Sequence, residues 1–142
     1  MVADRGAKAV PFSEFAPDHV LRFTTADLIA LELVAYGITA EELEREQAQG
    51  KMREPWTRAI ERRLSANDAR FIQEAVRIGV KKPGGFDRPE IKPEDLADLP
   101  FAPAEIVRKI ADALACAITG RAYADVIAER EAAEQEAAKA AA

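Results

Sequence analysis

The chain has 142 residues, of which 49% are hydrophobic and 32% are charged, and its formal net charge is -5. This length predicts one domain with a core large enough to fold without disulfide or metal staples. The only cysteine, Cys116, excludes an internal disulfide framework, and the only histidine, His19, excludes zinc sites that need several histidines. No apolar run reaches the roughly 18 residues of a membrane span, and no signal peptide is visible. We therefore expect a soluble, cytoplasmic protein.

Alanine and charge are unevenly distributed along the chain. The sequence has 30 alanines and only 6% aromatic residues, a composition that favours helix. Residues 1–50 carry 4 basic and 9 acidic side chains, residues 51–92 carry 11 and 6, and residues 93–142 carry 5 and 10. The net charges of -5, +5 and -5 give an acidic, a basic and an acidic third.

The first predicted elements are an N-terminal arm, a short extended segment, and a helix with clear end signals. Residues 1–18 contain scattered charge and prolines, which predicts a mobile arm with Val10, Phe12 and Phe15 as its anchors to the core. Residues 19–23 fit either one short strand or an extended lead-in. Thr24 or Thr25 can cap the following helix, and Gly37 can end it.

Three further helices are predicted in the middle of the chain. Thr39 and Glu42 form a capping box for a solvated helix over 40–49. A helix beginning at Pro55 carries Trp56, Ala59, Ile60 and Leu64 on one face. Ser65 caps the next helix, with Asp68 at its third position, and this helix stops near residues 81–85.

The last third predicts a short helix over 93–99 and a long amphipathic helix from Pro103 to Gly120. Residues 128–142 are rich in Ala and Glu and form either a solvated, fraying helix or a disordered tail. The expected fold is all-α: a small orthogonal bundle of four to five helices over 19–127. Residues 19–23 form either one short strand or an extended segment.

No catalytic or metal-binding set stands out in the sequence. Neither Ser13 nor Ser65 lies in a GxSxG turn that would pair a nucleophile with His19. Cys116 falls on or beside an apolar helix face, where a free cysteine packs as a small hydrophobe. A small enzyme built on His19 or Cys116 is the weakest alternative, so we expect no enzyme activity, no cofactor and no metal.

The basic middle third raises the alternative of a small helical DNA-binding regulator that uses residues 55–82. The expected basic surface consists of Arg58, Arg62, Arg63, Arg70, Arg77, Lys81 and Lys82. Acidic residues interrupt this stripe, and the flanking acidic thirds would repel phosphate. Internal charge pairing or self-association is the simpler interpretation, and nucleic acid is the less favoured partner.

Several short patterns in the chain resemble one known family. They are VLRFTTADLIALE at 20–32, RLSAND at 63–68, IGVKK at 78–82, two glycines at 84–85, PEDLADLP at 93–100 and AEIVRKIADAL at 104–114. In this order they resemble the tail assembly chaperones of long-tailed bacteriophages and gene transfer agents. The resemblance covers residues 20–120, but the Trp56 helix and the Ala-rich end have no match in it.

The resemblance implies a non-enzymatic role in the host cell cytoplasm. Such chaperones coat the long, helical tape measure protein, keep it extended and in solution, and recruit the tail tube subunits that displace them. They are absent from the mature particle. A generic helical protein-interaction adaptor is the broader alternative.

Two apolar sets are the predicted partner-binding residues. One set lies on the long helix and is more simply explained as core: Ile106, Ile110, Leu114 and Ile118. The other set follows Gly120 and is the better prediction for an exposed patch: Tyr123, Val126 and Ile127.

Overall fold

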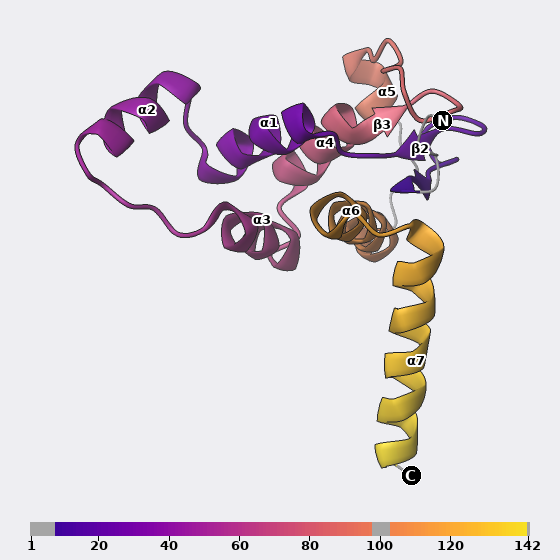
Figure 1. The fold of residues 1–142 in the computed structure, drawn as a ribbon. Coiled ribbons are helices and arrows are strands. Elements are labelled where there is room, and N and C mark those ends of the chain that lie inside the picture. Colours follow the sequence, from indigo (N-terminus) through magenta and orange to yellow (C-terminus); the bar gives the residue numbers. More distant parts are fainter. Residues whose placement is uncertain (1–7, 98–102, 142) are drawn as a thin grey trace, which may run out of the picture.

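The computed structural model describes residues 8–97 and 103–141, and most of these residues are helical, as the composition predicts (Figure 1). The elements in chain order are β1 (Val10–Pro11), β2 (Val20–Leu21), α1 (Thr25–Tyr36), α2 (Ala40–Ala48), α3 (Trp56–Ser65), α4 (Ala69–Gly79), β3 (Val80–Lys81), α5 (Pro93–Ala97), α6 (Pro103–Thr119) and α7 (Tyr123–Ala141).

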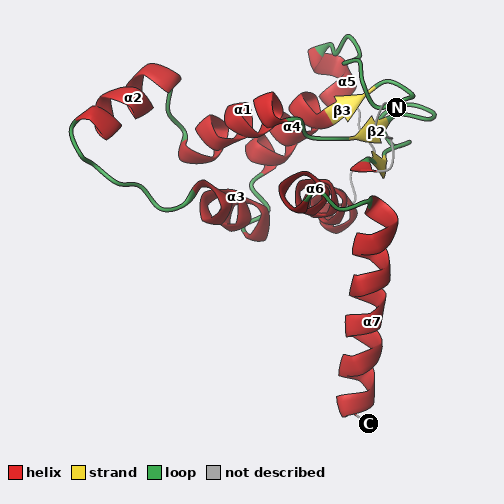
Figure 2. Ribbon diagram, viewed as in Figure 1, coloured by secondary structure: helices red, strands yellow, loops and turns green. Residues whose placement is uncertain are grey.

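A small antiparallel sheet brings three distant segments of the chain together in the order β1-β2-β3 (Figure 2). Leu21 of β2 pairs with Val10 on one side and with Val80 on the other. Of the two alternatives for residues 19–23, the short strand is therefore the one present, as β2. The sheet as a whole departs from an all-α fold, because β1 and β3 add two strands that the periodicity does not indicate.

The caps of the first two helices match the sequence. The Thr24 side chain accepts a hydrogen bond from the backbone N–H of Asp27, and the Asp27 carboxylate accepts one from the N–H of Thr24. Gly37 ends α1 in the left-handed region at φ +73°. Thr39 caps α2 by accepting from the N–H of Glu42 at 3.2 Å, which is one half of the predicted capping box. The Glu42 carboxylate accepts from the Thr39 hydroxyl at 3.3 Å rather than from the Thr39 backbone N–H. Each cap satisfies a backbone group that the helix end leaves unpaired.

The cap of α4 differs from the prediction. Ser65 is the last residue of α3, and the N-cap is Asp68, whose side chain accepts from the N–H of Phe71 at 3.2 Å. Asn67 turns the chain between the two helices at φ +52°. A carboxylate caps as well as a hydroxyl, so Asp68 can cap α4 and α3 can include Ser65 as its last residue. At its other end α4 stops at Gly79, because the chain then extends to pair with β2.

The core lies where α1, α3, α4 and α6 meet the sheet. Helices α2 and α7 contribute no buried residue to it. In Figure 1, α2 stands at one side of the molecule, and α7 extends away from it to the C-terminus. The buried core side chains are Val10, Phe12, Leu21, Phe23, Leu31, Ala35, Ala59, Ile60, Leu64, Phe71, Ile72, Ala75, Val76, Ile78, Val80, Ile106, Ile110, Ala113 and Leu114.

The two chain ends differ in how they pack. Residues 8–18, the described part of the expected arm, contain β1 and place Val10 and Phe12 in the core, while Phe15 packs against it. Residues 1–7 lie outside the described residues. The expected tail continues as helix α7, and its side chains from 131 to 141 are exposed.

Candidate functional site

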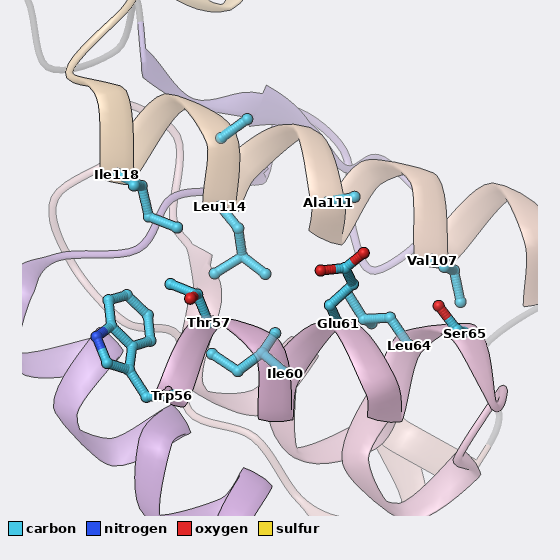
Figure 3. A pocket seen from close by; sticks show the side chains of 11 residues that line it. Trp56, Thr57, Ile60, Glu61, Leu64, Ser65, Val107, Ala111, Leu114 and Ile118 are labelled. Carbon is cyan, nitrogen blue, oxygen red and sulfur yellow. The ribbon is translucent and has the colours of Figure 1, made fainter. Parts of the chain in front are cut away.

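An open apolar groove of about 420 Å³ lies between α3 and α6 (Figure 3). Its α3 side is formed by Trp56, Ile60 and Leu64, with the polar side chains Thr57, Glu61 and Ser65. Its α6 side is formed by Val107, Ala111, Leu114, Ala115 and Ile118. This volume falls within the roughly 300–1,000 Å³ typical of binding pockets.

Helical periodicity explains why these side chains line one trough. On α3, Trp56, Ile60 and Leu64 repeat every fourth residue. On α6, Val107, Ala111, Leu114 and Ile118 follow the i, i+4, i+7, i+11 pattern of one helix face. At 1.5 Å per residue, that face extends about 16 Å along α6. The groove can therefore receive an elongated apolar segment.

The structure splits the predicted Ile106 set between core and groove. Ile106 and Ile110 are fully buried in the core at 1% and 0% exposure, so they cannot reach a partner in this fold. Leu114 lines the groove floor at 6%, and Ile118 is 51% exposed at one end of the groove. The apolar stripe of α6 is wide, so one edge packs in the core and the other edge lines the groove.

The predicted patch on α7 is partly covered rather than open. Tyr123, Val126 and Ile127 are half-buried, and Tyr123 packs against the core cluster. Two ion pairs tie α7 to α6: Arg130 to both carboxylate oxygens of Asp112 at 2.9 and 2.7 Å, and Arg108 to Glu134 at 2.9 Å. Helix α7 therefore uses a different face of α6 from the one that lines the groove.

The predicted basic surface is largely neutralised by ion pairs. Arg62 pairs with Glu54 at 2.6 Å, Arg63 with Asp68 at 2.9 Å, and Arg77 with Glu74 at 2.5 Å. In the described part of the chain, Arg58, Arg70 and Lys82 are the members of this set that form no ion pair. Internal pairing leaves less positive charge for phosphate contacts than the sequence count indicates.

Lys81 does not belong to the surface at all, which corrects its assignment. Its side chain is 2% exposed, and its ammonium group donates to Asp27 at 3.0 Å and to the backbone carbonyls of Ile78 and Gly79. Because Lys81 lies in β3 and α1 packs nearby, the lysine points inward to a buried carboxylate. Lys82 remains exposed.

Asp27 is a buried acid that the sequence presents only as a first-turn helix residue. It is 1% exposed and also accepts from Arg88 in the loop after β3. Burial alone would raise the pKa of Asp27, but the Thr24 N–H, Lys81 and Arg88 together hold that pKa below its ordinary value. Burial lowers the pKa of the Lys81 ammonium, and Asp27 opposes that change. This cluster joins α1, β3 and the following loop.

His19 lies beside an aromatic ring and a backbone carbonyl, and Cys116 lies in the protein interior. His19 lies beside Phe15, with ring centroids 5.4 Å apart, and its Nδ1 is 3.0 Å from the Pro17 carbonyl oxygen. Cys116 is fully buried, and burial followed by the nearby Asp112 raises the pKa of its thiol. A raised pKa keeps the thiol protonated at neutral pH, which makes it a poor nucleophile.

A smaller pocket of about 260 Å³ separates α2 from the end of α1 and the start of α3. Tyr36 donates to the Glu54 carbonyl at 2.5 Å, and Arg53 lies 5.4 Å from the centre of the Tyr36 ring. Arg53 also makes two 2.8 Å hydrogen bonds to Glu46 of α2. These contacts hold α2, which has no buried residue, beside the body of the protein.

Comparison of the chain with protein-family models, with curated proteins and with solved structures finds no match. Within residues 8–97 and 103–141, no group of three or more His, Cys, Asp and Glu side chains could hold a metal ion. In the same residues, no helix has both the length and the apolar character needed to cross a membrane.

Proposed function

We propose that this protein is a non-enzymatic tail assembly chaperone whose α3–α6 groove binds helical segments of a tape measure protein. The groove is the observation that carries the proposal. It has an apolar lining that the protein's own core leaves uncovered, and it has the length of two to three helical turns. The resemblance at residues 20–120 supports the choice of partner.

The composition of the groove suits a contact that must later be broken. Trp56 is the only aromatic side chain among the described residues that line it, and Ala111 and Ala115 occupy the centre of its α6 side. Tight interfaces depend on a few large anchors, chiefly Trp, Tyr and Arg, in fully desolvated pockets. A groove with one such anchor gives moderate affinity, so arriving tail tube subunits could displace the chaperone in the host cytoplasm before the particle is complete.

Size-exclusion chromatography tests the proposal with the full chain and segments of the tape measure protein encoded by the same genome. We expect the chaperone to shift to a larger species and to keep those segments in solution. A chain that neither shifts nor improves the recovery of any segment would contradict the proposal. A matched run with the tail tube protein tests whether the tube subunit releases the segment.

A further inference from the structure

We infer that the α3–α6 groove selects an amphipathic helix that carries a basic residue, Lys or Arg, opposite Glu61. This inference rests on the proposed function and deepens it by naming the chemistry of the bound segment. Glu61 is the only charged side chain among the described residues that line the groove. Figure 3 shows its carboxylate directed from α3 toward the α6 side, next to Ala111.

Glu61 differs from the acidic residues around it because it forms no ion pair with a cation among the described residues. Glu54, Asp68 and Glu74, which precede and follow it in the chain, each pair with an arginine. Among residues 8–97 and 103–141, Glu61 takes part in no ion pair, although Arg58 lies one turn earlier on the same helix. Its exposed carboxylate is therefore free to meet a charge from outside.

The shape of the groove favours a helix as the occupant. The α6 side chains Val107, Ala111, Leu114 and Ile118 repeat with helical spacing, and a second helix laid along them can place apolar side chains at i, i+4 and i+7 between the two walls. Ala111 and Ala115 let the occupant's backbone come close to α6. Thr57 and Ser65 leave the α3 edge polar on either side of Glu61.

Charge complementarity then decides which amphipathic helix binds. When an occupant covers the groove, it removes water from Glu61, and a carboxylate that loses water without gaining a cation costs free energy. A Lys or Arg beside the apolar stripe of the bound helix takes the place of that water as the partner of the Glu61 carboxylate. A Glu at the same place adds like-charge repulsion, so it weakens binding and slows association.

Two synthetic peptides test the inference against the full-length protein by fluorescence anisotropy. Both carry Leu at i, i+4, i+7 and i+11 on an Ala and Gln background, and they differ only in one Lys or one Glu next to the stripe. We expect the Lys peptide to bind about fivefold to tenfold more tightly than the Glu peptide. In Glu61→Lys this order is reversed. Glu44→Lys, which makes the same charge change on exposed α2 outside the groove, keeps the wild-type order.

Equal affinities for the two peptides, no binding of either, or a Lys preference that persists in Glu61→Lys would overturn the inference. These outcomes are separate from the test of the proposed function, which depends on the binding of tape measure segments. A Lys preference that depends on Glu61 supports the inference even where the segments from that genome do not bind.

Discussion

The carboxylate of Asp27 holds three segments of the chain together, through the Thr24 N–H, Lys81 and Arg88. We expect Asp27→Asn to lower the free energy of unfolding by about 3–5 kcal/mol, because it leaves the buried Lys81 ammonium without its counter-charge. Urea denaturation measures this loss. The double variant Asp27→Leu with Lys81→Met removes both charges and should lose less than the single variant. An equal or larger loss in the double variant would contradict the importance of the ion pair.

The same residue predicts a dependence of stability on pH. Because the folded-state pKa of Asp27 is lowered, its stabilising contribution is present above its unfolded value of 3.8 and is lost as pH falls through the folded-state pKa. The difference in unfolding free energy between wild type and Asp27→Asn should therefore stay constant from neutral pH down to about pH 5 and narrow as pH falls below 3.8. A difference that stays constant below pH 3.8 would contradict the lowered pKa of Asp27.

Replacing Gly79 by alanine changes the stability of the protein in two opposite ways. Replacing a helical glycine by alanine normally adds about 1 kcal/mol of stability. Here the added Cβ would lie 2.7 Å from the ring of Phe23, which is itself buried in the core. We expect the clash to dominate, so that Gly79→Ala destabilises the protein by about 1–3 kcal/mol in thermal or chemical unfolding. The loss should shrink in a Phe23→Leu background, and an unchanged loss there would rule out the clash as its cause.

At the scale of elements, α7 is a helix with two different halves. Its first half packs against the core through Tyr123 and contacts α6 through the Arg130–Asp112 pair, while its last eleven residues are exposed. We expect deletion of residues 131–142 to change the free energy of unfolding by less than about 0.5 kcal/mol, because the exposed Arg108–Glu134 pair is the only ion pair that the described residues lose. Arg130→Ala should instead speed hydrogen exchange throughout α7. Strong destabilisation by the deletion would mean that the terminal half packs on the body.

The elements also show what the sequence can and cannot predict. The caps at Thr24, Thr39 and Gly37 depend on local backbone geometry, so the sequence predicts where α1 and α2 begin and where α1 ends. Strand β3 depends on pairing with β2, where Leu21 pairs with Val80 and Val20 with Lys81, and this pairing is not local in the chain. The apolar spacing of α4 continues into Val80, so the sequence does not mark the change from helix to strand. The buried Asp27–Lys81 pair joins residues 54 apart, and no local signal identifies it.

At the scale of the whole molecule, the groove is the feature that the sequence indicates only in part. The apolar stripes of α3 and α6 are visible in the sequence. Which edge of each stripe is covered depends on how the two helices are placed against α1 and α4. That placement buries Ile106 and Ile110 and leaves Ile118 open. The charge of the basic third is likewise reduced by partners that only the fold brings close, such as Glu54 for Arg62.

The most direct test of the groove as the docking site is a matched pair of substitutions. Ile118 lines the groove at 51% exposure, whereas Ile29 lies on α1 outside the groove at 59% exposure. Both side chains are exposed, so Glu at either position should leave the fold intact. Calorimetric titration with a tape measure segment should show at least about tenfold weaker binding for Ile118→Glu and wild-type affinity for Ile29→Glu. Equal affinities of wild type and Ile118→Glu for that segment would contradict docking in the α3–α6 groove.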